Sequence, residues 1–162
     1  MTSDPDTGHT ILRHLLATMT YRAAKATRNA PPGFGEFRAR EGARTPVEIL
    51  AHIGDLCDWG LSIAKGKETW RDAVPQAWEE ELSRFYASSK AFDDYLADPM
   101  PLFCPVERLI QGPMADAISH VGQIAMLRRL FGSPIRGESY FRADIKPGQV
   151  GPNQPPPKRE FD

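Results

Sequence analysis

The sequence predicts an all-α protein: an up-and-down four-helix bundle at residues 1–134, followed by an irregular C-terminal extension at 135–162 that is rich in proline and glycine. Three observations support this prediction. Four stretches repeat apolar residues with the period of an amphipathic helix, proline or glycine bounds each of them, and no stretch alternates like a strand. Four helices of similar length are typical of an antiparallel bundle.

The first helix is expected at residues 7–29. Apolar side chains recur there at intervals of three and four residues, and most of the basic side chains fall outside that face. Pro31, Pro32 and Gly33 end the helix, so residues 34–44 form a connecting loop. Phenylalanines 34 and 37 in this loop are expected to hold it against the bundle.

The second helix has the clearest start in the sequence. Thr45 and Glu48 form a capping-box pattern, and between them Pro46 suits the first helical position because its nitrogen carries no hydrogen to leave unpaired. The helix is expected to end near Ala64. Its apolar face includes His52.

The third and fourth helices are expected at residues 75–98 and 112–134. The third carries apolar and aromatic side chains on one face and charged side chains on the other. Pro113 supplies the start of the fourth helix, and Gly132 supplies its stop. Each boundary follows from proline or glycine residues near the helix ends, so this part of the prediction needs no tertiary information.

The segments outside these helices are expected to be short or irregular. Residues 105–110 form at most a single turn before the fourth helix. In the tail, Tyr140, Phe141 and Val150 are expected to pack on the bundle, whereas the three prolines at 155–157 favour an extended, solvated chain.

Composition excludes several classes of partner. The chain has 20 basic and 21 acidic residues, a net charge of -1, and no basic cluster, which argues against nucleic-acid binding. No apolar run is long enough for a membrane span, and the N-terminal residues lack the pattern of a signal peptide, so we expect a cytoplasmic protein. Cys57 and Cys104 are too few for a disulfide scaffold and lack zinc-site spacing, so we expect reduced thiols.

Three polar side chains on the expected inner faces indicate a metal site. Asp116 and His120 lie four residues apart on the fourth helix and point to one side, and a carboxylate among core residues normally pairs, protonates or binds a cation. In an up-and-down bundle the second and fourth helices run in the same direction, which puts His52 and His120 at similar depths of about 9 and 10.5 Å from their helix starts. Two nitrogen ligands and one oxygen ligand leave positions open for water or substrate, as in catalytic sites.

Taken singly, each of these residues has a simpler explanation: a core histidine hydrogen-bonded to a neighbour, or an Asp–His ion pair without metal. Only the three residues taken together, with the matching depth of the two histidines, favour an ion. His14 is the runner-up ligand, although a surface position is expected for it. Gln123 and Arg128 flank the apolar arc, where they either orient a ligand or simply pack at the helix edge.

The residues around the expected metal site resemble one protein family, the DinB-like (DinB/YfiT-like) superfamily of metalloenzymes, which is distinct from the DNA polymerase sharing that name. The resemblance rests on Pro46-x5-His52, on Asp116-x3-His120-x-Gly122-Gln123-Ile124, and on Leu127-Arg128-Arg129-Leu130. The tail at residues 140–144 and 150–152 is also similar to that of some members. The similarity extends over nearly the whole chain, and the fourth helix is its distinctive part.

The resemblance implies an up-and-down four-helix bundle, often a homodimer, that holds a divalent ion such as nickel or zinc through three side chains. Members typically use one histidine on the second helix and two histidines four residues apart on the fourth. His52 and His120 match this pattern, whereas Asp116 replaces the first histidine of the pair. A carboxylate ligand favours harder ions, so manganese and iron stay open beside zinc and nickel.

The resemblance also implies a function. Characterised members include S-transferases and isomerases that use low-molecular-weight thiols, so we expect a metal-dependent transferase or hydrolase in which the ion activates a thiol or water toward a small-molecule substrate. No separate catalytic base stands out in the sequence. The alternative is a non-enzymatic dimeric bundle, related to stress or to binding a small ligand, whose polar triad is structural.

Overall fold

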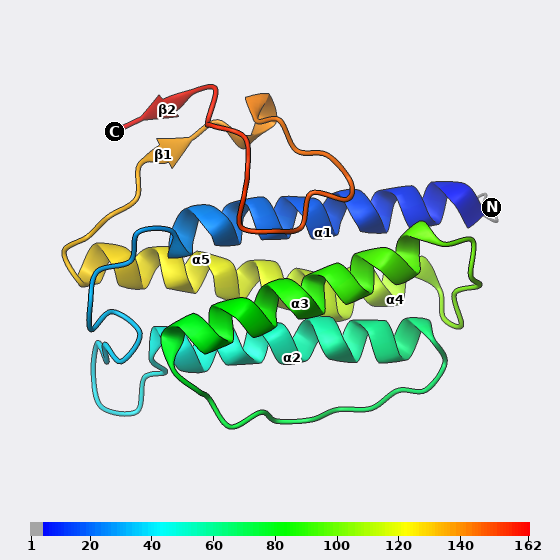
Figure 1. Cartoon of the computed structure of the whole chain (residues 1–162), viewed down its shortest axis with the longest axis horizontal. Helices are drawn as coiled ribbons and strands as arrows, with labels where there is room; N and C mark the ends of the chain where they lie inside the picture. Colours follow the sequence, from blue (N-terminus) through cyan, green and yellow to red (C-terminus); the bar gives the residue numbers. More distant parts are fainter. Residues whose placement is uncertain (1–4) are drawn as a thin grey trace.

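The computed structural model describes residues 5–162, which form mainly four long helices (Figure 1). These are α1 (Pro5–Thr27), α2 (Pro46–Ala64), α3 (Trp78–Ala97) and a composite fourth helix made of α4 (Val106–Leu109), the π-helical turn η1 (Ile110–Met114) and α5 (Ala115–Leu130). The described part of the tail adds the strands β1 (Gly137–Glu138) and β2 (Glu160–Phe161) and the 3-10 turn η2 (Tyr140–Arg142). The all-α prediction is confirmed, and residues 1–4 of the expected bundle lie outside the described residues.

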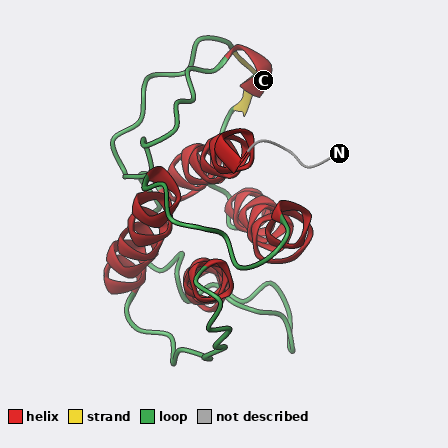
Figure 2. Ribbon diagram, turned by 90° about the vertical axis from the view of Figure 1, so that its right-hand side faces the viewer, coloured by secondary structure: helices red, strands yellow, loops and turns green. Residues whose placement is uncertain are grey.

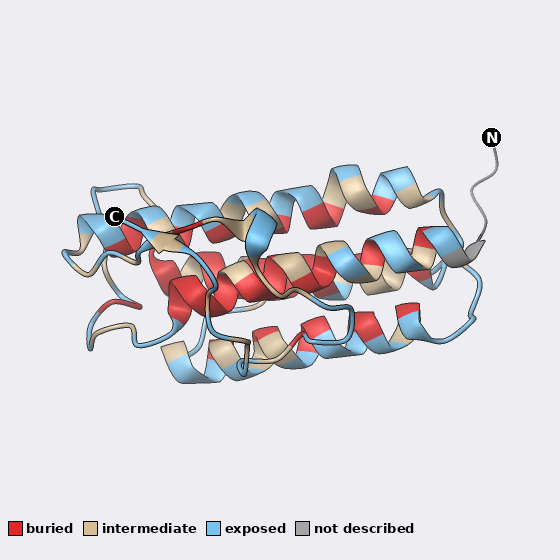
Figure 3. Ribbon diagram, turned by 90° about the horizontal axis from the view of Figure 1, so that it is seen from above, coloured by how far each residue is buried: buried red, intermediate tan, exposed pale blue. Residues whose placement is uncertain are grey.

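The hydrophobic core lies between the four helices, which turn their buried faces toward one another (Figure 3). Its largest fully buried apolar side chains are Phe34, Phe85, Phe92, Leu12, Leu16, Leu50, Ile53, Leu96, Leu109 and Ile124. The loop after α1 is held as predicted, because the rings of Phe34 and Phe37 contact Phe131 at centroid distances of 5.6 and 5.2 Å. No helix within residues 5–162 is both long and apolar enough to cross a bilayer.

Helix α2 begins and ends where the sequence predicts. The Glu48 backbone N–H donates to the Thr45 hydroxyl at 3.3 Å, and the Glu48 carboxylate accepts from the Thr45 backbone N–H at 2.7 Å. This reciprocal capping box satisfies two backbone donors that the first turn of a helix leaves unpaired. The ends of α1 and α3 differ by up to three residues from the expected ones, because helix ends have weaker local signals than a capping box.

The directions of the helices differ from the predicted up-and-down order. Helices α2 and α3 run parallel, as do α1 and α5, because the connection 65–77 travels back along the whole bundle before α3 begins (Figure 1). Extended, this connection reaches about 43 Å, whereas the 20-residue α3 is about 30 Å long, so the return is sterically easy. Contacts between α2 and α3 advance together along both helices: Asp55 with Arg84, Cys57 with Ser89, and Gly60 with Phe92.

The fourth helix begins earlier than predicted. The structure continues it from Val106, so Pro113 lies inside the helix rather than at its start. A proline inside an α-helix lacks one hydrogen-bond donor, and its ring collides with the carbonyl four residues before it. The π-helical turn η1 widens the helix at this point and accommodates both defects. The expected short turn at residues 105–110 is therefore the first part of the same helix.

The C-terminal tail packs along α1, to one side of the bundle (Figure 2). Val150 is buried, and the Tyr140 ring meets Tyr21 edge-on at a centroid distance of 6.2 Å, so these two predicted contacts are confirmed. The prediction for Phe141 is wrong, since its side chain is 97% exposed. A further contact was not expected: Glu138 is buried against Lys25 of α1.

Candidate metal centre

The structure brings His52, Asp116 and His120 together between α2 and α5. The Asp116 carboxylate lies 3.6 Å from His52 Nε2 and 3.4 Å from His120 Nε2, and the two imidazole rings are 4.7 Å apart at their centroids. One donor atom from each residue falls within 4.8 Å of the other two. The predicted convergence of these three side chains is confirmed, and within residues 5–162 they form the one group with this geometry.

Two of the arguments from the sequence that predicted this convergence are wrong. Asp116 is not buried in the core: its side chain is 51% exposed, because the buried face of α5 is offset by one residue and runs through Ala117, Val121 and Ile124. Helices α2 and α5 are also antiparallel, so equal depth from their starts does not align the histidines. They meet because the start of α2 and the end of α5 share one end of the bundle (Figure 1).

The centre therefore lies on the flank of the bundle, where it is accessible. The side chains of His52 and His120 are 20% and 12% exposed, which is partial burial, while Asp116 faces solvent. An arrangement with two sheltered nitrogen donors and one exposed oxygen donor has an open side toward solvent. A small molecule can reach the donors from that side.

Neighbouring side chains orient both imidazoles. The amide oxygen of Gln123 lies 2.8 Å from His120 Nδ1, where it accepts a hydrogen bond from the ring and points Nε2 of the same ring toward Asp116 at 3.4 Å. Trp70 meets the His52 ring edge-on at 5.6 Å and also meets Trp59 at 5.8 Å. For Gln123 the sequence left two roles open, orienting a ligand or packing at the helix edge. It gave Trp70 no role, because nothing local links residues 52 and 70.

The charge state of His52 suits metal binding. Partial burial lowers the pKa of His52, as do the positive charges of His120 and Arg44, and these effects outweigh the opposite effect of Asp116. A histidine whose pKa falls below 6.5 is mainly neutral at pH 7. Neutral imidazole is the form that binds metal ions.

The distances between donor atoms are compatible with a shared ion as well as with Asp–His ion pairs. Hydrogen bonds between nitrogen and oxygen have lengths of about 2.7–3.2 Å, and the two contacts of Asp116 are longer than this. Ligands bound at about 2.0–2.1 Å in a tetrahedral site lie about 3.3 Å from each other. In the cluster Asp116 approaches His52 through Oδ2 at 3.6 Å and His120 through Oδ1 at 3.4 Å, and one donor atom of each residue lies within 4.8 Å of the other two, so the three side chains together offer donors that fit one divalent ion.

The connection 65–77 forms one side of the site and is fixed by buried charges. Asp55, one turn after His52, accepts a hydrogen bond from the backbone N–H of Ala73 at 3.1 Å. Its other carboxylate oxygen accepts from Arg84 of α3 at 3.1 Å. These bonds hold the connection against α2 beside the histidines.

A surface pocket of about 330 Å³ opens beside His52. It is lined by residues 38 and 42–44 of the loop before α2, by side chains of the first turns of α2, and by residues 72 and 73 of the connection. A pocket of this size suits a small ligand.

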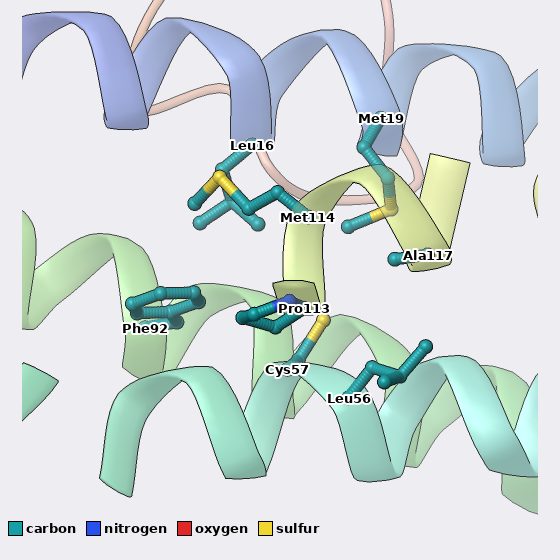
Figure 4. A pocket seen from close by; sticks show the side chains of 8 residues that line it. All are labelled: Leu16, Met19, Leu56, Cys57, Phe92, Pro113, Met114 and Ala117. Carbon is teal, nitrogen blue, oxygen red and sulfur yellow. The ribbon is translucent and has the colours of Figure 1, made fainter. Parts of the chain in front are cut away.

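Neither cysteine belongs to the centre. Cys57 lies in the core between α1, α2, α3 and η1, where apolar side chains surround a void of only about 10 Å³ (Figure 4). Burial raises the pKa of the Cys57 thiol to about 12, so it is protonated and unreactive near neutral pH. Cys57 therefore does not supply a reactive thiol to the centre.

The other sequence candidates lie elsewhere. His14 is exposed on α1, as expected, and is not part of the cluster. Arg128 is buried and has a structural role: it donates to the backbone carbonyls of Ala26, Arg28 and Ser133, which ties the end of α1 to the end of α5. It does not orient a ligand of the metal centre.

Searches against protein-family models, curated proteins and solved structures find no match to this chain. The DinB-like resemblance, the homodimer and the cytoplasmic location therefore stay predictions. The candidate centre is supported by its own geometry alone.

Proposed function

We propose that this protein is a divalent-metal-dependent enzyme of the DinB-like type, in which His52, Asp116 and His120 hold one zinc or nickel ion and the substrate is a small molecule. The observation that supports this most directly is the convergence of one donor atom from each of the three residues to within 4.8 Å of one another.

The residues of the centre have distinct tasks in this proposal. Gln123 fixes the tautomer and ring plane of His120, and Trp70 shields one edge of His52 from water. The exposed side of Asp116 leaves access for the reacting molecule. A bound ion supplies the chemistry of lowering the pKa of a thiol or water, so that a nucleophile exists near neutral pH. We propose a low-molecular-weight thiol or water as that nucleophile, in a transfer or hydrolysis reaction.

Metal analysis tests the first part of the proposal. Protein purified without an affinity tag, or reconstituted with zinc or nickel, is expected to hold about one equivalent of metal per chain, because the cluster offers three ligands and an open side. Replacing Asp116→Ala together with His120→Ala removes two of the three donors and is expected to abolish binding.

The matched control is His14→Ala, which removes an exposed histidine outside the cluster and is expected to leave the metal content unchanged. No stoichiometric metal after reconstitution, or equal metal in the wild type and the double variant, contradicts the proposal. For the enzymatic part, a panel of electrophiles is incubated with thiols or with water alone. Chelator-sensitive consumption of the electrophile is expected, and its absence in metal-loaded protein favours the non-enzymatic bundle.

Gln123→Leu is expected to weaken metal affinity by about tenfold or more, because the partner that orients a ligating histidine contributes a factor of about 10–100 to affinity. Gln123 itself is exposed, so the folded state is expected to tolerate the change. Competition against a chelator of known affinity measures the effect. Gln111→Leu, at another exposed position of the same composite helix, is the control, and an equal loss in both variants contradicts the orienting role.

A further inference from the structure

The pocket beside His52 contains an arginine that the metal centre does not use. Arg44 ends the loop before α2, is exposed, and lines the same pocket of about 330 Å³ as His52. Within residues 5–162, the Arg44 side chain makes neither a hydrogen bond nor an ion pair. It is close enough to His52 for its charge to lower the pKa of that imidazole.

The other charged groups of the pocket already have partners. Arg38 donates to the Glu48 carboxylate at 3.2 Å, which neutralises both groups. Asp55 is bound by Arg84 at 3.1 Å. The remaining carboxylate, on Asp72, accepts a hydrogen bond from the Trp70 indole at 3.1 Å. Arg44 is thus the cation of this pocket that is free to bind an anion from solution.

We propose that the substrate carries a carboxylate or similar small oxyanion, and that Arg44 binds this group while another donor atom of the same molecule reaches the metal centre. The inference rests on the proposed function, since it assigns a substrate class to that site. A planar guanidinium binds a carboxylate or phosphate through two parallel hydrogen bonds, which gives orientation as well as affinity. Arg44 therefore orients the ligand relative to His52.

The position of the pocket supports this assignment. The pocket is lined both by the loop that carries Arg44 and by the connection 65–77, which Asp55 holds in place. The volume of about 330 Å³ is at the lower end of the range for small-molecule pockets, which is about 300–1,000 Å³. An anion of a few carbon atoms fits this volume.

Calorimetry of the zinc-loaded protein tests the inference with two probes, mercaptoacetate and its neutral amide, mercaptoacetamide. Both present a thiol to the ion, and only the first presents a carboxylate to Arg44. We expect mercaptoacetate to bind about tenfold more tightly, a difference of about 1.4 kcal/mol. Arg44→Gln is expected to remove this preference. Arg40→Gln, an exposed arginine of the same loop outside the pocket, is expected to keep it.

The outcomes distinguish the two proposals. Zinc binding with equal affinity for acid and amide, or a preference that survives in Arg44→Gln, overturns the inference and leaves the metal centre intact. Absence of zinc binding in the wild type contradicts the proposed function, and the inference with it. Displacement of mercaptoacetate by acetate supports a carboxylate substrate, and displacement by inorganic phosphate supports a phosphate ester, with Arg44 as the anchor in either case.

Discussion

Replacing Lys25→Met is expected to lower the free energy of unfolding by about 3–5 kcal/mol, because it leaves a buried carboxylate without its counter-charge. Lys25 Nζ lies 2.9 Å from Glu138 and 3.1 Å from Glu160, and the side chains of Lys25 and Glu138 are only 7% and 1% exposed. The hydroxyl of Tyr21 also donates to Glu138, at 2.5 Å. The Tyr21 hydroxyl is neutral, so its hydrogen bond to Glu138 does not compensate for the lost positive charge of Lys25. Urea unfolding followed by circular dichroism measures the loss.

The Lys25 cluster also predicts a pH dependence. Burial alone lowers the pKa of Lys25, but the hydrogen bonds and charges of Glu138 and Glu160 outweigh it, so the pKa lies above the usual 10.5. This stabilisation is fully present below about pH 10.5 and is lost as the pH rises through the higher pKa of the folded state. The wild type is therefore expected to lose stability on strong alkalinisation, and Lys25→Met to lose less over the same range.

Lys158→Met is the control for this prediction, because Lys158 pairs with Asp144 in the same tail but both side chains are about half exposed. Exposed pairs contribute at most about 1 kcal/mol, so only a small loss is expected. Lys25→Met combined with Glu138→Leu removes both charges and is expected to be more stable than Lys25→Met alone. Equal losses for Lys25→Met and Lys158→Met contradict the buried ionic role of Lys25.

Local signals allowed part of this structure to be predicted from the sequence. The capping box of Thr45 and Glu48 places the start of α2 because both hydrogen bonds form between residues three apart. Asp116 and His120 point to the same side because they are four apart on one helix. The ligand set therefore depends on only one long-range contact, between His52 and this pair.

The remaining features depend on tertiary structure that the local pattern does not contain. The connection 65–77 is long enough either to turn back at once or to return along the bundle, so its composition does not set the direction of α3. Pro113 is tolerated inside a helix because η1 widens there, and a proline by itself indicates a start equally well. The exposure of Asp116 depends on a small rotation of α5 against its neighbours, which periodicity alone does not resolve.

Arg84→Met is expected to lower the free energy of unfolding by about 3 kcal/mol and to loosen the connection 65–77 beside the metal centre. The Arg84 guanidinium binds Glu81 at 2.9 Å, Asp55 at 3.1 Å and the carbonyl of Ala51 at 2.6 Å. Glu81 and Asp55 are 1% and 7% exposed, whereas Arg84 is 28% exposed, so the loss lies at the lower end for a buried pair. Gly54 permits this approach, since a Cβ atom there meets the guanidinium carbon at 3.0 Å.

The loosening of the connection 65–77 in Arg84→Met can be measured at a single backbone amide. The Ala73 backbone N–H donates to the same Asp55 carboxylate that Arg84 holds, so its hydrogen exchange is expected to accelerate in the variant. Lys90→Met is the control on α3, because Lys90 and Asp94 are 68% and 61% exposed and contribute little. Unchanged exchange at Ala73 in both variants contradicts the role of Arg84. Accelerated exchange in Arg84→Met alone means that α3 positions the residues beside His52 through the ionic contact between Arg84 and Asp55.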